Sequence, residues 1–337
     1  MTDVMIFAPA PTLTVTVEDH PDGSDVHVHA GGQGVWQARM LRRLGADVIM
    51  CSVLTGETGQ ILLHLLEDEG IRVVSVEREG RGSAYVHDRR EGHRVAVVEE
   101  EGDPIGRHEL DELYGVALEA GLAARLAILS GPSGDRALPP DTYRRLAADL
   151  REGGAQVVVD LAGDRLDAAL AGGVDVLKVS DEELRDDGRV AEASVPALLV
   201  AMRELRAAGA RTVIVSRSEQ PLILLDEHGF VEVTPPELQV ADTRGAGDSL
   251  TAGVAAAMAR GEPPREAVTL GAAAGALNVT RHGLGTGDAG TIARLREAVV
   301  VRALADAQSA GVEQPNTGRV SPDGLAALAE PPDEEPS

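Results

Sequence analysis

The stretch Asp242-Thr-Arg-Gly-Ala-Gly-Asp-Ser249 runs directly into Leu250-Thr-Ala-Gly-Val-Ala-Ala-Ala-Met258, so a turn of small residues opens a helix. The first turn of a helix carries unpaired backbone N–H groups at the positive end of the helix dipole. Small side chains let a phosphate approach those groups closely, so the turn predicts an anion site. Asp248 lies at its rim, where a carboxylate can accept a proton from an attacking hydroxyl during phosphoryl transfer.

A simpler interpretation is that Asp248 only caps the helix, which is a common role for aspartate. The sequence also argues against other phosphate sites. It lacks Gly-x-x-x-x-Gly-Lys-Ser/Thr, so it is not a P-loop enzyme, and it lacks Gly-x-Gly-x-x-Gly after its first strand, which argues against a dinucleotide enzyme.

On the N-terminal side of this turn, from about residue 109, short β-rich runs alternate with helical stretches. The candidate strands are Leu126–Ser130, Gln156–Asp160, Val174–Val179 and Thr212–Ser216, and the helical stretches include 140–152 and 192–208. Residues 34–69 follow the same scheme, with a helix at 34–44, a strand at 47–53 and a helix at 58–69. This alternation predicts an α/β fold with a mainly parallel sheet covered by helices on both faces.

Two regions interrupt the alternation, Thr12–Ala30 and Arg72–Glu100, because they contain strands without intervening helices. We interpret them as a small antiparallel flap inserted into the larger domain, built from about residues 10–30 and 72–101. Further along the chain, 221–225 and 230–233 are predicted to form a hairpin.

The composition of the chain argues against some classes of binding partner. The chain has 337 residues, 43% of them hydrophobic, and a net charge of −24, so it would repel nucleic acid and anionic membranes. Any anion site must therefore be built locally. Cys51 is the only cysteine, and we expect it to be an inert buried residue. We see no signal peptide and no stretch long enough to span a membrane, so we expect a cytoplasmic protein.

Two motifs together resemble the PfkB carbohydrate kinases. Asp242-Thr-Arg-Gly-Ala-Gly-Asp248 is similar to their Asp-Thr-x-Gly-Ala-Gly-Asp, and Gly31-Gly-Gln-Gly-Val-Trp-Gln-Ala-Arg-Met-Leu-Arg-Arg-Leu-Gly45 resembles their N-terminal Gly-Gly-Lys-Gly-x-Asn-x-Ala-Arg-x-Leu-x-x-Leu-Gly. The resemblance covers roughly residues 5–290. It is strongest to the branch that phosphorylates fructose 1-phosphate, fructose 6-phosphate and tagatose 6-phosphate. It implies a ribokinase-like three-layer α/β/α fold with a small β-sheet flap.

The resemblance assigns roles around the nucleotide. Asp248 would be the catalytic base, and Gly245, Ala246 and Gly247 would form the anion hole. Lys178-Val-Ser-Asp-Glu-Glu-Leu184 looks like the family's Lys-Pro-Asn-x-x-Glu-Leu, so Lys178 would lie near the ATP phosphates and Glu183 would help to hold Mg²⁺ through water. The other nucleotide-binding residues that the resemblance implies are Ser216, Ser218, Thr243, Arg244, Asn278 and Gly283. Ser180 replaces the family's Asn, and Ser218 and Pro221 replace two loop glycines.

The match weakens on the acceptor side. Thr14 stands where the family has the Asp that binds sugar hydroxyls, Gln33 replaces a Lys, and Trp36 replaces an Asn. The family's flap arginine would fall near Gly82, where Arg81, Arg89 and Arg90 are close. The acceptor-binding residues implied by the resemblance are Thr14, Gly31, Gly32, Gln33, Trp36, Arg81 and Arg90.

The resulting prediction is an ATP-dependent kinase of a sugar or sugar phosphate that uses Mg²⁺ and forms a homodimer through its flap. We expect a kinase domain at 1–305 and a C-terminal extension at 306–337 that ends in an acidic, partly disordered, proline-rich tail. Two alternatives stay open. One is a kinase of an unphosphorylated sugar or nucleoside, favoured by Gln33 and Thr14. The other is a regulatory protein that binds nucleotide or sugar without turnover, favoured by the lost loop glycines and Ser180.

Overall fold

The structure is a computed structural model that describes residues 2–132, 134, 136–239, 242–280 and 285–304. The described residues up to Ala303 form one compact unit. The acidic tail predicted at 306–337 lies outside the described residues, as does Gly283.

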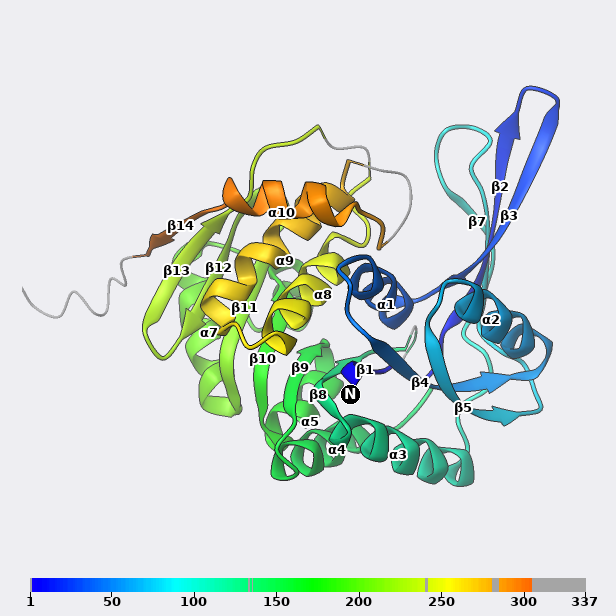
Figure 1. Ribbon diagram of the computed structural model, residues 1–337, viewed down its shortest axis with the longest axis horizontal. Coiled ribbons are helices and arrows are strands. Elements are labelled where there is room, and N and C mark those ends of the chain that lie inside the picture. The colour runs from blue at the N-terminus through cyan, green and yellow to red at the C-terminus, as the bar shows by residue number, and fades with distance from the viewer. Residues whose placement is uncertain (1, 133, 135, 240–241, 281–284, 305–337) are drawn as a thin grey trace, which may run out of the picture. The chain divides into compact units, whose positions relative to one another are not determined.

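A ten-stranded sheet runs through the first unit in the order β14-β13-β12-β11-β10-β9-β8-β1-β4-β5 (Figure 1). The strands from β5 to β11 in that order are parallel, and β12, β13 and β14 add an antiparallel edge. The strand bounds are β1 Thr2–Phe7, β4 Val48–Thr55, β5 Arg72–Arg78, β8 Ala124–Ser130, β9 Gln156–Asp160, β10 Val174–Ser180, β11 Ala210–Arg217, β12 Gln220–Asp226, β13 Gly229–Thr234 and β14 Val300–Ala303.

Helices cover both faces of this sheet. The bounds are α1 Gln33–Arg43, α2 Gly56–Asp68, α3 Arg107–Leu122, α4 Asp141–Glu152, α5 Gly163–Gly172, α6 Asp181–Asp186, α7 Val195–Ala208, α8 Ala246–Ala259, α9 Pro264–Asn278 and α10 Ala289–Glu297. Helix α8 packs against α1 and α9, and α9 packs against α10, whereas α4 packs against α3 and α5 (Figure 1). The two groups lie on opposite faces, as the predicted three layers require.

Burial on both faces explains the near-continuous apolar strands. In β1, Val4 and Ile6 belong to the core cluster that also contains residues of α1, α8 and α9, while Met5 and Phe7 point to the opposite face and are equally buried. Phe7 packs edge-on against Tyr143 of α4, with ring centroids 5.6 Å apart. The predicted strands, the helices and the hairpin at 221–233 are all present within a few residues of their expected bounds.

The flap differs from its prediction in two respects. It consists of β2 Thr12–His20, β3 Gly23–Gly31, β6 Ala84–Asp88 and β7 Val95–Glu100, in the order β3-β2-β6-β7. Residues 72–78, expected in the flap, instead form β5 and pair in parallel with β4 in the large sheet. The flap is also not wholly antiparallel, because β2 and β6 pair in parallel. Sequence alternation identifies a strand but carries no information about its partner.

The α8–α9 interface provides a test of this packing. A Cβ atom at Gly253 of α8 would lie 2.6 Å from Cα of Gly271 in α9, whereas one at Gly115 of α3 would meet nothing within 4 Å. We expect Gly253→Ala to lower the free energy of unfolding by about 1–3 kcal/mol through overpacking. The matched Gly115→Ala should raise it by about 0.5–1 kcal/mol, because alanine favours the helix. Urea denaturation measures both, and equal effects at the two sites would contradict the close approach of α8 and α9.

Candidate active site

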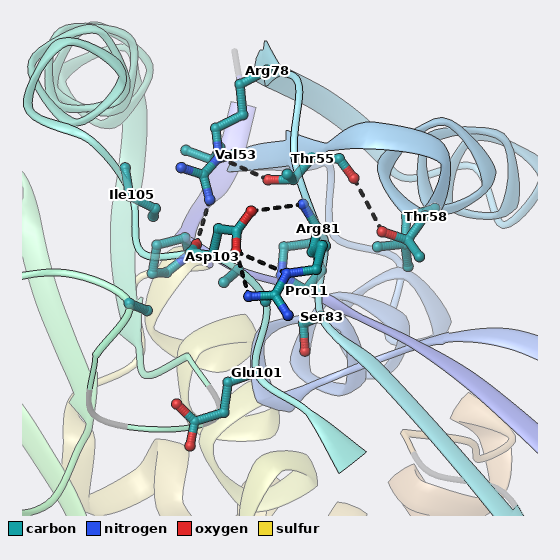
Figure 2. Close-up of a pocket in the computed structure, with 16 residues that line it drawn as sticks. Pro11, Val53, Thr55, Thr58, Arg78, Arg81, Ser83, Glu101, Asp103 and Ile105 are labelled. Atoms are coloured by element: carbon teal, nitrogen blue, oxygen red, sulfur yellow. Dashed lines mark hydrogen bonds and ion pairs between the residues drawn. The ribbon is translucent and has the colours of Figure 1, made fainter. Parts of the chain in front are cut away.

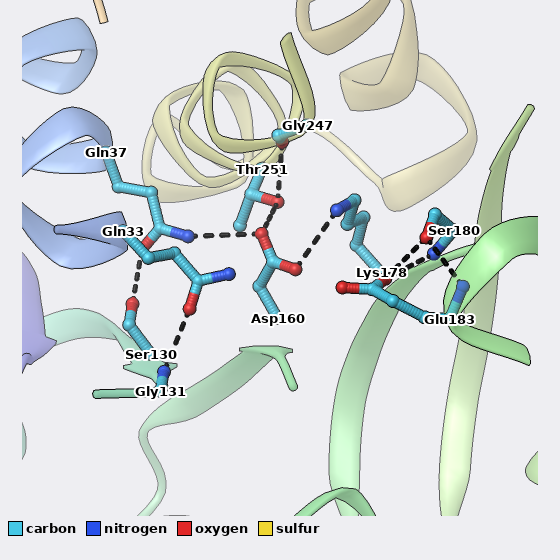
Figure 3. A network of polar contacts seen from close by, with 10 residues as sticks. All are labelled: Gln33, Gln37, Ser130, Gly131, Asp160, Lys178, Ser180, Glu183, Gly247 and Thr251. Carbon is cyan, nitrogen blue, oxygen red and sulfur yellow. Dashed lines mark hydrogen bonds and ion pairs between the residues drawn. The ribbon is translucent and has the colours of Figure 1, made fainter. Parts of the chain in front are cut away.

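The polar residues of the candidate site gather where the parallel strands end (Figure 3). Ser130 ends β8, Asp160 ends β9 and Ser180 ends β10. The carboxyl ends of parallel strands open at one edge of a sheet, so side chains that are far apart in the sequence meet there. The N-terminus of α8 faces the same place, because a Cβ atom at Gly247 would lie 2.7 Å from Nζ of Lys178.

The turn before α8 has the backbone that an anion site needs. Gly245 precedes the helix with φ of 69°, a left-handed conformation that glycine adopts at little cost, and no side chain caps the helix. No side chain therefore competes with a ligand for the N–H groups at the start of α8, of which that of Ala246 makes a 3.4 Å bond to the Thr243 carbonyl. Gly247 has room only for hydrogen beside Lys178. A side chain there would displace the ammonium group from its position beside the turn.

Asp160, which the sequence analysis did not single out, is the centre of the network. Its carboxylate is 1% exposed and accepts hydrogen bonds from Gln37 at 3.2 Å, Thr251 at 2.8 Å and Lys178 at 3.1 Å. The donors come from α1, α8 and β10, so one buried carboxylate holds three elements together. A signal was present in the sequence, because Asp160 is an acidic residue at the end of an apolar strand.

Asp248 and Lys178 are electrostatically coupled through this network. Asp248 is 8% exposed, and burial raises its pKa. The charge of Asp160 raises the pKa further, while Lys178 opposes the shift, and the net direction is upward. Burial alone would lower the pKa of Lys178, but Asp160, Glu183 and Asp248 raise it by more, so the ammonium stays charged. Asp248 is thus a carboxylate with an elevated proton affinity beside a fixed cation.

The Ser180 and Glu183 side chains form a capping box at the start of α6. Oε2 of Glu183 accepts hydrogen bonds from the backbone N–H of Ser180 at 2.7 Å and from its hydroxyl at 2.8 Å. Serine in place of the family's asparagine is therefore accommodated locally, and it orients the Glu183 carboxylate. Figure 3 shows this pair beside Lys178.

The loop expected over the nucleotide lies between β11 and β12. Ser216 pairs with Ser180 in the sheet, so the loop starts beside α6. Ser218 has φ of 46° and is the one non-glycine residue with a positive φ among the described parts of the chain. The resemblance places a glycine here, and the backbone keeps a conformation that favours glycine although the residue has changed.

Asn278 supports the turn Asp242–Gly247 before α8, which we call the anion turn. Its side-chain amide donates to the carbonyl of Arg244 at 2.6 Å, and its carbonyl accepts from the N–H of Gly285 at 3.1 Å. Asn278 is 1% exposed. Its polar atoms therefore support the turn from behind. The neighbouring Thr243 accepts a 3.4 Å bond from the Ala246 N–H through its carbonyl.

A cavity of about 950 Å³ lies between the flap and the anion turn. The acceptor-side residues Thr14, Gly32 and Trp36 line it. Gly31 lies against Thr14, since a Cβ atom there would collide with the Thr14 hydroxyl. Other residues of its wall are Thr12, Thr16, His27, His29, Arg39, Tyr85, Arg89, Arg94, Asp242 and Arg244.

Three residues expected in acceptor binding have other surroundings. Gln33 is not in the wall of the large cavity, and its side-chain carbonyl accepts from the N–H of Gly131 at 2.9 Å (Figure 3). Arg81 binds Asp103 and lines a smaller cavity of about 20 Å³ near the base of the flap (Figure 2). Arg90 pairs with Asp88.

The flap arginines that do line the cavity are Arg89 and Arg94. The sequence analysis noted Arg89 but missed Arg94, because Arg94 lies beyond the β6–β7 turn and returns to the site only when the hairpin closes. His87 of β6 has a pKa lowered to about 4, first by burial and then by Arg94 and Arg89.

A known protein family matches most of the chain. Residues 2–289 match the family profile described as pfkB family carbohydrate kinase.

The chain belongs to the pfkB family.

Its curated relatives include ATP-dependent 6-phosphofructokinase isozyme 2 of Escherichia coli K12, 28% identical over 298 residues, which cover 81% of this chain and 91% of the relative. The isozyme 2 of Mycobacterium tuberculosis is 30% identical over 262 residues, which cover 73% of each chain. The 1-phosphofructokinase of Vibrio cholerae is 26% identical and covers 82% of this chain and 87% of its own.

Solved structures confirm the ribokinase-like fold. Phosphofructokinase-2 of Escherichia coli in complex with potassium is similar with a TM-score of 0.76 and 25% identity, and covers 88% of this chain and 99% of its own. Arabidopsis thaliana ribokinase has a TM-score of 0.70 at 21% identity, and covers 88% of this chain and 99% of its own.

The prediction of an ATP-dependent pfkB-type sugar kinase, a phosphotransferase acting on a hydroxyl group, is confirmed. None of the described helices could cross a bilayer.

The charge network predicts an acid limb in the pH profile. We expect kcat/KM for the acceptor to fall with acid at a pH above the range of an ordinary aspartate, because the pKa of Asp248 is raised by burial and by Asp160. Asp160→Asn removes the negative charge that opposes ionisation of Asp248, so its pKa drops and the acid limb moves to lower pH.

The measurement is the pH dependence of kcat/KM in both proteins, with thermal denaturation to confirm folding, because Lys178 loses a buried partner. Asp141→Asn on α4, which removes an exposed carboxylate paired with Arg144, is the matched control and should leave the limb in place. An unchanged or upward-shifted limb in Asp160→Asn would disprove the coupling.

Proposed function

We propose that Asp248 is the general base that activates a hydroxyl group of a sugar or sugar phosphate, and that the turn Gly245–Gly247 holds the transferring phosphoryl group. The observation that carries the proposal is the buried Asp248 carboxylate, with its raised pKa, at the uncapped N-terminus of α8 beside Lys178.

The reaction balances at these groups. The acceptor oxygen forms a bond to the γ-phosphorus as the bond from that phosphorus to the bridging oxygen of ADP breaks, and the hydroxyl proton passes to Asp248. A raised pKa suits this transfer, because a base with higher proton affinity takes the proton more readily while remaining ionisable near neutral pH. The N–H groups of Ala246 and Gly247 and the ammonium of Lys178 stabilise charge on the phosphoryl oxygens.

The nucleotide is proposed to lie on the β10–β11 side of the turn. Lys178 would contact its phosphates, with Ser216 and Ser218 in the loop above it and Thr243 at the start of the turn. This assignment is supported by the common position of Lys178, Ser180 and Ser216 at the ends of neighbouring strands. Asn278 would act by supporting the Arg244 carbonyl. On the acceptor side we propose Thr14, Gly31, Gly32 and Trp36.

The acidic groups near Lys178 fit Mg²⁺. Glu183 and Asp160 supply carboxylate oxygens, the ligand type that Mg²⁺ prefers. In the described parts of the chain no three or more His, Cys, Asp or Glu residues are arranged to hold a metal. A Mg²⁺ ion bound largely by ATP phosphates and water needs only one or two carboxylates, and we propose Glu183 for this role. When bound, the ion would neutralise phosphate charge.

We further propose that the protein is a cytoplasmic homodimer that pairs through the flap. The register places Val15, Val28, Val86 and Val98 on one face, opposite the face of Thr14 and His29. We call this face the valine face; its valines are Val15, Val17, Val26, Val28, Val86, Val95 and Val98. The polar face borders the cavity, whose wall Val26 and Val28 also reach, and Val28 and Val98 are 44% and 48% exposed. An apolar sheet face left in solvent is suited to a second copy, and the ATP requirement supports the cytoplasm.

The base assignment predicts the outcome of Asp248→Asn. The substitution keeps the size of the side chain and removes the proton acceptor, so we expect kcat to fall by about 10²–10⁴-fold with little change in the KM for ATP. The assay is ADP release with fructose 6-phosphate or fructose 1-phosphate and Mg-ATP. Asp141→Asn on α4 should retain wild-type rates. Near-normal turnover in Asp248→Asn would mean that the carboxylate only caps α8.

The dimer proposal predicts the effect of a charge on the valine face. Val98→Asp should convert the protein to monomer, because a carboxylate without a partner is costly to bury in an apolar interface. Light scattering after size exclusion measures the mass. Val200→Asp is the matched control, since Val200 of α7 is 44% exposed outside the flap, and this variant should remain dimeric. A dimeric Val98→Asp variant, or a monomeric wild type, would reject the flap interface.

A further inference from the structure

Four arginines line the large cavity, and they differ in whether they form an ion pair. Arg39 forms an ion pair with Glu69, and Arg89 lies 3.4 Å from Glu18. For Arg94 and Arg244, no side-chain hydrogen bond or ion pair occurs among the described residues. These two cations line one cavity although they come from different segments, since Arg94 belongs to the flap and Arg244 precedes the turn Gly245–Gly247.

Five of the six carboxylates in the wall of the same cavity have an ion-pair partner or a hydrogen bond, and the sixth, Glu99, is exposed to solvent. Glu18 and Glu69 are paired as above, Glu100 lies 3.9 Å from Arg81, and Glu101 lies 3.6 Å from Arg136. Asp242 accepts a hydrogen bond from the Arg244 backbone N–H at 3.0 Å. The guanidinium groups of Arg94 and Arg244 therefore remain available to a ligand.

These two guanidinium groups are close enough to interact unfavourably. Burial lowers the pKa of Arg94, and the charge of Arg244 lowers it further. His29, on the same wall, also has a lowered pKa, first through burial and then through Arg39 and Arg94. Arg94 and Arg244 thus add two cations, without an ion pair among the described residues, to a wall that also holds six carboxylates, in a chain of net charge −24. An anion placed between two partly desolvated cations relieves their repulsion and gains charge-assisted hydrogen bonds from both.

We propose that Arg94 and Arg244 together hold the phosphate of a phosphorylated acceptor, so that the acceptor bridges the flap and the anion turn. The proposal rests on the sugar kinase function proposed above and narrows its acceptor to sugar phosphates. The resemblance to the family assigned Arg244 to the nucleotide, and its acceptor cations lie elsewhere, near Gly82 and at Gln33, so this assignment differs from the one it implied. Gln33 is held by Gly131 instead.

A phosphate of ATP has the same chemistry, but the surroundings favour the acceptor. Arg94 and Arg244 share their cavity with Thr14, Gly32 and Trp36, which lie on the acceptor side. Lys178 and Gly247, the residues proposed to contact the nucleotide phosphates, are not part of the cavity wall.

Steady-state kinetics separates the two sources of phosphate. We expect Arg94→Gln and Arg244→Gln each to lower kcat/KM for fructose 6-phosphate or fructose 1-phosphate by about ten- to a hundredfold. Activity with fructose and the KM for ATP should change little. Arg94→Lys should recover part of the loss, because it restores charge without the planar fork. The matched control is Arg107→Gln on α3, where the side chain is 95% exposed.

Equilibrium binding tests, without turnover, whether Arg94 and Arg244 clamp the acceptor phosphate between them. Calorimetry with fructose 6-phosphate, fructose 1-phosphate and inorganic phosphate is carried out with Mg²⁺ and a non-hydrolysable ATP analogue, so that the nucleotide phosphate site is filled. Each single variant should weaken binding of the phosphorylated probe that binds best by about ten- to a hundredfold. The double variant should lose less than the product of the single losses, because both arginines contact one group.

The outcomes distinguish the clamp from the kinase assignment. If a sugar phosphate binds through both arginines but no acceptor is phosphorylated, the proposed function fails and the clamp stands. The clamp is overturned if none of the phosphorylated probes binds wild type, if the variants bind them as wild type does, or if phosphorylated and free sugars lose activity equally. A rise in the KM for ATP instead would assign the pair to the nucleotide.

Discussion

The buried carboxylate of Asp160 is the interaction on which the site depends. Lys178, Thr251 and Gln37 reach it from β10, α8 and α1, and each donor satisfies one of its lone pairs. A buried charge is tolerated only when it is paired and hydrogen-bonded, so the three elements must keep their relative positions. The same contacts put the ammonium of Lys178 against Gly247 and set the charge around Asp248. The need of the buried Asp160 carboxylate for hydrogen-bond donors thereby fixes the position of Lys178 and the charge around Asp248.

The flap shows how one sheet can serve two different surroundings. Alternation along β2 and β3 puts threonines and histidines on the face that borders the cavity and valines on the other face, although Val26 and Val28 also contribute to the cavity wall. The exposed face is the apolar one, which is the reverse of the usual arrangement in a sheet with one face in water. This reversal follows from position, because the flap covers a polar cavity and has no hydrophobic core beneath it. The flap can therefore contribute charge to the acceptor site while presenting apolar surface to a partner.

Several positions that depart from the family pattern have local structural solutions. Ser180 completes a capping box with Glu183, and Ser218 keeps the left-handed backbone of the glycine it replaces. Gln33 spans from α1 to the N–H of Gly131 at the end of β8. On the acceptor side the changes are larger, since Thr14 and Trp36 replace polar side chains of different shape. Arg94 and Arg244 supply cations to the cavity, whereas Gln33 no longer carries the charge of the Lys that it replaces.

Sequence alone determined the features that are written within a few residues. The turn Gly245–Asp248, the alternation of strands and helices, and the hairpin at 221–233 depend on backbone conformation and local periodicity, which neighbouring residues specify. Only the tertiary structure decided which strand β5 joins, which flap arginines reach the cavity and that Asp160 is the centre of the network. These outcomes depend on register between distant segments, as between Thr16 and His87, which are 71 positions apart. Strand periodicity specifies which face a side chain occupies, whereas its partner is chosen by the packing of the whole domain.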